Sequence, residues 1–166
     1  IPPDQLPGII EQQAKMMPIF GWVGGPVFIA FMLLVIAGSL MFVFRFFYAG
    51  EVSFKQAFAI VLWVFLAVSV VSIPVTLTVL TLKGDWNIDP NQAVQANLGL
   101  LLDKSTAAKP LWALLTSIDL FVLWRVFLMA VGFGVASRKP TASALWGVAI
   151  PWAVIVLCKV GWAALF

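Results

Sequence analysis

Three ionisable side chains interrupt apolar stretches of this sequence, and their chemistry is the most informative feature of the chain. Asp119, Arg125 and Lys159 each lie within a long run of hydrophobic residues. An ionisable group near the middle of a bilayer costs several kcal/mol unless it is paired or hydrated. Each of these residues therefore needs a partner in the bundle, or it lines a path for ions or lipid headgroups.

The depths of two of these residues along their expected helices predict that they form an ion pair. If a helix enters the membrane near Pro110, Asp119 lies roughly 13 Å deep at the rise of an α-helix. Lys159 lies about 10 Å from the corresponding end of the last helix, which runs the opposite way. We therefore predict an Asp119–Lys159 ion pair, with Ser72 and Thr76 at similar depth as further hydrogen-bond partners.

Arg125 has no predicted acidic partner. It is six residues from Asp119, so the two side chains point about 120° apart around a helix, and no other acidic residue lies at its depth. Three alternatives stay open: the side chain extends to the cytoplasmic surface, bonds to carbonyls freed by Pro74 or Pro151, or holds a lipid phosphate in a hydrated crevice.

The remaining composition argues against catalysis. The chain has no His and one Cys, Cys158, which excludes a disulfide within the chain, the usual zinc sites and a His-ligated haem. It contains neither a phosphate-binding G-x-x-x-x-G-K-[ST] loop nor a G-x-S-x-G nucleophile motif. We therefore expect no catalytic site, no metal and no cofactor. The net charge of +3 gives no reason to propose a nucleic-acid partner.

The elements that carry these residues are expected to be transmembrane helices. Hydrophobic residues make up 63% of the chain and charged residues 10%, a balance outside that of soluble domains. Four apolar runs are about as long as a membrane-spanning helix, which needs roughly 20 residues. The expected fold is an all-α polytopic bundle, a single domain with spans at about 23–44, 57–82, 111–136 and 142–166.

The loop between the second and third spans is expected to carry one more helix. Asp89 followed by Pro90 and, two residues later, Gln92 is typical of a helix start. The predicted helix covers about 90–103 and is too short to cross the membrane. We expect it to lie on the membrane surface.

The short links predict the orientation of the chain. Arg45 and Lys55 flank the first link, and Arg138 and Lys139 form the third, so both links carry more Lys and Arg than acidic residues. Such links face the cytoplasm. We therefore expect an integral protein of the bacterial inner membrane, with the long loop and the C-terminus on the opposite side.

Two stretches of the sequence carry a recognisable pattern. One runs from Ser117 to Trp124 (SIDLFVLW) and continues to Gly134, and the other is Gly50–Ala57 (GEVSFKQA). Both resemble the Yip-domain family, whose eukaryotic members interact with Ypt and Rab GTPases. Asp119 and Trp124 match the family pattern. The resemblance implies five spans and a cytoplasmic N-terminus, so we expect one span upstream of Ile1. Rab binding is not carried over to any residue.

Two classes of function follow from these observations. The first is a non-enzymatic scaffold or accessory subunit, which contacts lipids and packs against other membrane subunits or a second copy. Small residues on the third span, Gly132 and Gly134 with Ala130 and Ala136, suit such close packing. The alternative is a small transporter or lipid-handling protein with a polar path at Asp119 and Arg125.

Overall fold

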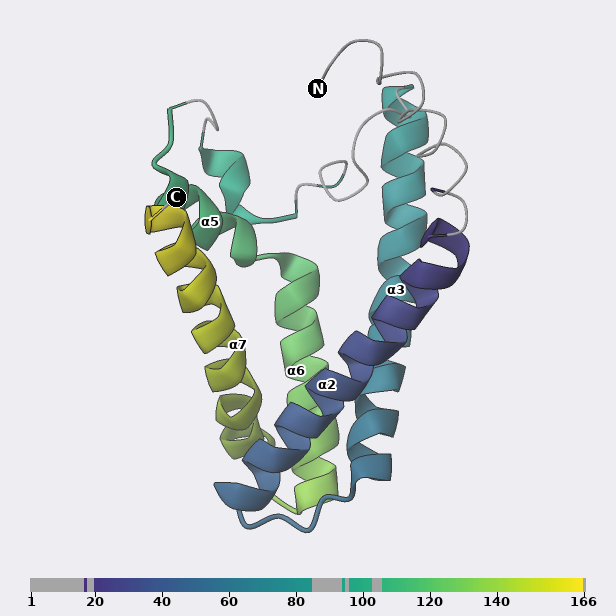
Figure 1. Cartoon of the computed structure of the whole chain (residues 1–166), viewed down its shortest axis with the longest axis vertical. Helices are drawn as coiled ribbons and strands as arrows, with labels where there is room; N and C mark the ends of the chain where they lie inside the picture. The colour runs from purple at the N-terminus through teal and green to yellow at the C-terminus, as the bar shows by residue number, and fades with distance from the viewer. Residues whose placement is uncertain (1–16, 18–19, 85–93, 95, 103–105, 166) are drawn as a thin grey trace, which may run out of the picture.

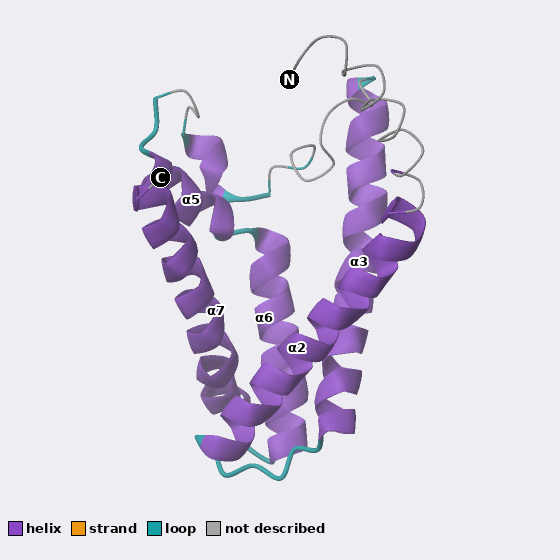
Figure 2. Ribbon diagram, viewed as in Figure 1, coloured by secondary structure: helices purple, strands orange, loops and turns teal. Residues whose placement is uncertain are grey.

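The structure, a computed structural model, describes residues 17, 20–84, 94, 96–102 and 106–165. Figure 1 shows a bundle of helices, and Figure 2 shows that helices and loops account for all of the described part of the chain. A short π-helix, η1 (Phe20–Gly24), leads into the first span. The other elements are α2 (Gly25–Phe46), α3 (Phe54–Lys83), η2 (Leu98–Leu101), α5 (Lys109–Ser117), α6 (Leu120–Ser137) and α7 (Thr141–Leu165).

The expected all-α bundle with four spans is confirmed. Four helices of the described residues are long and apolar enough to cross a membrane, and they run over Gly21–Phe46, Phe54–Lys83, Leu120–Ser137 and Thr141–Leu165. Pro74 and Pro151 both lie inside continuous helices.

Local sequence determines how the short links begin and end these helices. Ser53 caps α3: its hydroxyl oxygen accepts a hydrogen bond from the Gln56 N–H, and the Gln56 side chain accepts one from the Ser53 N–H. Arg138 adopts a left-handed conformation (φ 54°) after α6, which turns the chain sharply into α7. Both links lie at the same end of the bundle (Figure 1).

Close packing joins these two links. A Cβ on Gly50 would lie 2.9 Å from the Cβ of Ser137, so only glycine lets the first link approach the end of α6 this closely. At the same end, Phe44 of α2 stacks on Phe133 of α6 with ring centroids 4.8 Å apart. The two basic links therefore belong to one compact face, as the predicted orientation requires.

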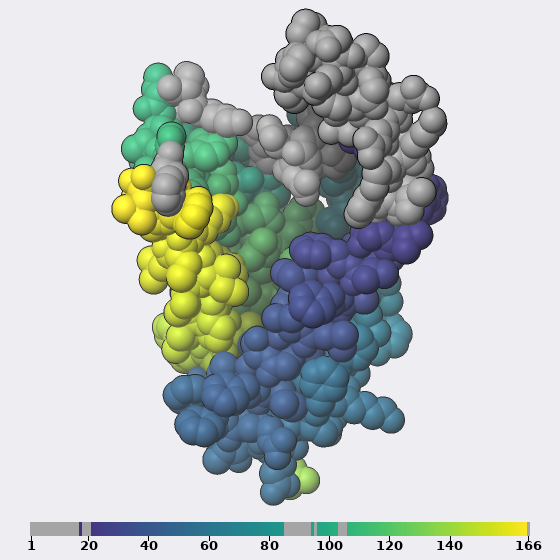
Figure 3. Space-filling model, in the orientation of Figure 1, coloured from purple at the N-terminus to yellow at the C-terminus, as the bar shows by residue number. Residues whose placement is uncertain are grey.

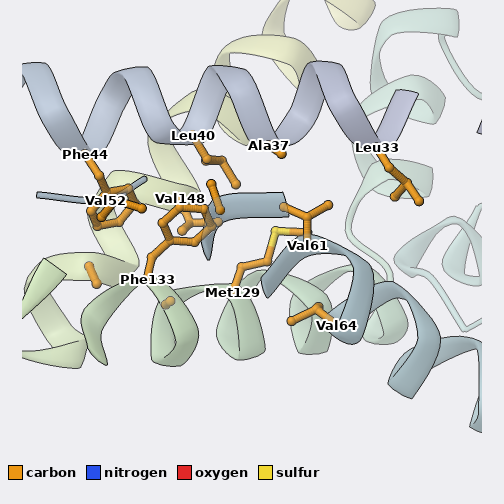
Figure 4. Packing of buried hydrophobic residues seen from close by; sticks show 13 residues of the cluster. Leu33, Ala37, Leu40, Phe44, Val52, Val61, Val64, Met129, Phe133 and Val148 are labelled. Carbon is orange, nitrogen blue, oxygen red and sulfur yellow. The ribbon is translucent and has the colours of Figure 1, made fainter. Parts of the chain in front are cut away.

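The buried core occupies this half of the bundle. Figure 4 shows α2 lying across α3, α6 and α7, with apolar side chains from each helix meeting in one cluster. Its labelled members are Leu33, Ala37, Leu40, Phe44, Val52, Val61, Val64, Met129, Phe133 and Val148. Beyond this core, large hydrophobic side chains such as Phe28, Trp63 and Ile155 are exposed, as lipid-facing residues are.

The third span differs from its prediction. The apolar stretch 111–136 is not one helix, because α5 ends at Ser117 and α6 begins at Leu120. Ile118 and Asp119 between them have non-helical backbone angles. Hydropathy alone cannot detect such a break, because the residues on both sides of it are apolar. The spanning part is α6, while α5 packs against the C-terminal part of α7.

The predicted surface helix over 90–103 falls partly outside the described residues, as does its expected start at Asp89–Gln92. Within the described part, one turn of 3₁₀-helix, Leu98–Leu101, replaces a continuous helix. Asn97 caps this turn by accepting a hydrogen bond from the Gly99 N–H. The backbone just before it is extended, because it pairs with the break in the third span.

Candidate functional site

The break between α5 and α6 positions the polar residues that the sequence analysis singled out. Asp119 is the N-cap of α6, and its Oδ1 accepts hydrogen bonds from the N–H groups of Phe121 (2.8 Å) and Val122 (3.2 Å). The first N–H groups of a helix have no partner within that helix. In apolar surroundings an unmet N–H costs several kcal/mol, so the carboxylate stabilises a helix start within the bundle.

The loop before α5 satisfies the other peptide groups at this break. Ala96–Leu98 lies antiparallel to Ile118–Leu120 and forms an isolated bridge at Asn97 and Asp119. The Leu98 N–H donates to the Ile118 carbonyl at 3.1 Å, and the Leu120 N–H donates to the Ala96 carbonyl at 3.0 Å. Irregular backbone in a membrane protein requires such internal partners. The break is therefore a stable part of the fold, because its peptide groups are hydrogen-bonded within the protein.

Lys159 lies near this break, but its bond differs from the predicted one. Its Nζ donates to the hydroxyl oxygen of Ser117 at 3.0 Å, and no Asp119–Lys159 ion pair occurs among the described residues. The predicted partner, Asp119, lies two residues along the chain from the observed partner, Ser117. The prediction failed at Asp119 because that carboxylate is turned toward the N–H groups of its own helix.

Ser72 and Thr76 do not join Asp119 or Lys159 in the described structure. The Thr76 hydroxyl donates to the Ser72 carbonyl at 2.8 Å, a bond within α3. Ser69, Ser72 and Thr76 share a half-buried face of α3, as their spacing predicts.

Arg125 makes the most distinctive contact of the site. Its Cζ lies 4.4 Å from the ring centroid of Phe65 on α3, a cation–π contact. Its Nε is buried and has no hydrogen-bond partner. Phe65 was not predicted as a partner, because one aromatic residue in an apolar run gives no signal in the sequence.

Asp119 lies at the start of the helix that carries Arg125, but no hydrogen bond joins the two side chains among the described residues. The Asp119 carboxylate instead accepts backbone hydrogen bonds. The guanidinium donors of Arg125 therefore gain no acceptor from Asp119.

The other predicted features have smaller roles at this site. Trp124, which matched the family pattern, is half-buried on α6. The small residues of α6 pack inside the chain: Ala130 is fully buried, and added Cβ atoms on Gly132 and Gly134 would meet Ile60 and the Lys139 carbonyl. Among the described residues no group of three or more His, Cys, Asp or Glu could hold a metal ion.

Comparison with protein families decides the identity of this bundle. Residues 2–163 match the Yip1 domain. The chain belongs to the Yip1 domain family. The match includes the first span as well as the stretch from Gly50 onward on which the resemblance rested. No curated protein and no solved structure matches the chain. This Yip1 domain protein is therefore an integral membrane protein, and its described residues include four apolar helices long enough to span a membrane.

Proposed function

We propose that this Yip1 domain protein is a non-enzymatic scaffold or accessory subunit of a membrane complex. In this role the bundle presents its apolar outer faces to lipids and to neighbouring membrane subunits or a second copy. Large exposed hydrophobic side chains on every span support the proposal. The break in the third span gives the bundle a fixed polar structure at the end opposite the basic links.

The observation that best supports this proposal is that the Asp119 carboxylate is already hydrogen-bonded within the bundle. A carboxylate that relays protons or binds transported ions must be free to exchange partners. The Asp119 carboxylate instead accepts two backbone hydrogen bonds that begin α6. Nearby, the ammonium of Lys159 is bonded to Ser117. Two of the three intramembrane charges thus have bonds that stabilise the bundle.

The alternative, a transporter or lipid-handling protein with a path at Asp119 and Arg125, is favoured by one observation, the unmet donors of Arg125. These donors support lipid contact rather than ion transport, because no second ionisable group is bonded to the guanidinium among the described residues. Lipid binding is compatible with a scaffold.

We place the protein in the bacterial inner membrane with both basic links in the cytoplasm. Arg45, Lys55, Arg138 and Lys139 lie in or beside the two links that pack together at one end of the bundle. This clustering supports the orientation that the positive-inside rule predicts. The Asp119 cap would then lie toward the outer face.

Reconstitution into liposomes tests the scaffold proposal. We expect wild-type protein and the Asp119→Asn variant to give the same proton, ion and lipid flux as liposomes without protein, because Asn keeps the helix cap and removes the charge. Fluorescent pH, ion and lipid reporters measure these fluxes. A flux that wild type supports and Asp119→Asn abolishes would identify a transport path and contradict the proposal.

A further inference from the structure

Arg125 carries hydrogen-bond donors that nothing in the described structure satisfies. A guanidinium has five N–H donors and cannot lose its charge in a protein. Phe65 covers one face of the Arg125 guanidinium, and its Nε is buried without a partner. Because it forms no hydrogen bond within the described residues, the cation needs an acceptor from outside them.

Ser69 and Ser72 on α3 likewise have hydroxyls without a hydrogen-bond partner among the described residues. Past the first turn of each spanning helix, every other described Ser and Thr side chain donates to a carbonyl of its own helix. Ser69 and Ser72 make no such bond, although both are half-buried. An unbonded hydroxyl in apolar surroundings is costly, and hydroxyls can donate to an anion.

The packing of α3 against α6 brings these groups toward one place. A Cβ on Gly132 would touch Ile60, and Arg125 covers Phe65, so the two helices run antiparallel with a known register. About one turn beyond Phe65, Ser69 reaches the level of Val122, and Ser72 reaches that of Asp119. Ser69 and Ser72 follow Phe65 by four and seven residues, so their hydroxyls lie on the face of α3 that carries Phe65, outward of the Arg125 guanidinium.

The two helices part at this level. Figure 1 shows α3 continuing well beyond the start of α6 and diverging from it. Between Val68 and Lys83, Leu80 is the one buried residue of α3. In the space-filling view the surface is hollowed between α7 and α2, with α6 recessed behind them (Figure 3). Exposed apolar side chains of α3 and α6, such as Val70 and Leu123, lie at the level where the two helices part.

We propose that Arg125, Ser69 and Ser72 bind the phosphodiester of a phospholipid, with its acyl chains lying against the apolar faces where α3 and α6 part. A phosphate supplies the several acceptor oxygens that a guanidinium and two hydroxyls require. Arg125 is the sixth residue of α6, about 8 Å from the start of that helix. A phosphate bound there lies within the bundle, where an ionised partner offsets the cost of the buried guanidinium.

Asp119 does not block this site. Its carboxylate is hydrogen-bonded to the two N–H groups at the start of α6, which compensate part of its charge. No hydrogen bond joins it to Arg125 among the described residues, so it does not fill the hydrogen-bonding sites of the guanidinium. The acyl chains distinguish a lipid from a free phosphate ion, because only a lipid also covers the exposed apolar side chains near the site, such as Leu123 and Val70.

Binding of defined lipids to purified, delipidated protein in detergent tests the proposal. Native mass spectrometry would compare dioleoyl phosphatidylglycerol, dioleoylglycerol (the same chains without phosphate) and inorganic phosphate. We expect tight binding of the phosphatidylglycerol alone, and an Arg125→Gln variant that binds it about tenfold more weakly. Arg45→Gln, which removes an exposed cation at the opposite end of the bundle, should bind as wild type does.

A second variant keeps the test decisive if Arg125→Gln disturbs folding. Ser69→Ala with Ser72→Ala preserves the helix, since Ala is the better helix former, and should weaken phosphatidylglycerol binding severalfold. Undiminished binding in either the Arg125→Gln or the double variant would overturn the proposal. So would equal binding of dioleoylglycerol, or equal binding of inorganic phosphate, which would indicate a free-anion site.

Discussion

Single residues at the helix break determine how this bundle tolerates charge within apolar surroundings. Asp119 caps α6, Lys159 bonds to Ser117, and Arg125 stacks on Phe65. Each of these three contacts involves an uncharged partner, and none pairs one charged side chain directly with another. An ion pair between helices carries a large desolvation cost, whereas a cap offsets that cost with backbone N–H groups that would otherwise be unmet.

Substitution of Asp119 separates a capping role from a role of its charge. Asn is an N-cap comparable to Asp, whereas replacing the cap by Ala costs about 0.5–2 kcal/mol. We expect Asp119→Ala to lower the thermal unfolding temperature in detergent clearly, and Asp119→Asn to stay close to wild type. Circular dichroism or a thiol-independent thermal-shift assay measures both. Equal destabilisation by Asn and Ala would show that the charge, and not the cap, stabilises the bundle.

Sequence reasoning identified these residues but not their bonds. The costs of intramembrane charge pointed to Asp119, Arg125 and Lys159, and the matched depths brought Lys159 close to the break. The cap was missed because Asp119 sits inside a continuous apolar run, where hydropathy indicates a helix interior. A signal was present, since Asp is among the strongest N-cap residues. No comparable signal marks Phe65, whose contact with Arg125 depends on the register of two distant helices.

The elements of the bundle follow from the sequence with one exception. The first, second and fourth spans are long, uninterrupted apolar runs, and α2, α3 and α7 correspond to them. The third span divides because backbone pairing with Ala96–Leu98 and the Asp119 cap together satisfy the peptide groups at a break. Such pairing joins segments about twenty residues apart in the chain, which local patterns do not reveal.

Two glycines of α7 provide a matched test of how the elements pack. A Cβ on Gly147 would lie 2.9 Å from Phe44 Cζ and 3.1 Å from Tyr48 Cε2, whereas Gly161 has open space around it. We expect Gly147→Ala to lower the free energy of unfolding by about 1–3 kcal/mol, because it overpacks the contact between α2 and α7. Gly161→Ala should be neutral or slightly stabilising.

Denaturant or thermal unfolding in detergent measures both glycine variants. A Gly147→Ala protein as stable as Gly161→Ala would mean that α2 does not pack on α7 as described. The comparison isolates packing because both substitutions add the same methyl group to the same helix.

At the scale of the whole molecule, the bundle has two distinct ends. One end carries the basic links, the aromatic stack of Phe44 on Phe133 and the buried core. The other carries the helix break, Arg125 and the parting of α3 from α6 (Figure 1). This difference between the two ends underlies both proposals, in which the core faces the cytoplasm and the lipid-binding groups lie toward the outer leaflet.

The orientation of these two ends is the central claim, and cysteine labelling tests it most directly. In a Cys158→Ser background, Glu51→Cys places a thiol in the first link and Ala108→Cys places one at the start of α5, both at exposed positions. We predict that a membrane-impermeant maleimide labels the Ala108→Cys protein in intact bacterial cells, and labels the Glu51→Cys protein only after the cells are opened. Labelling of Glu51→Cys in intact cells, with Ala108→Cys protected, would contradict the account.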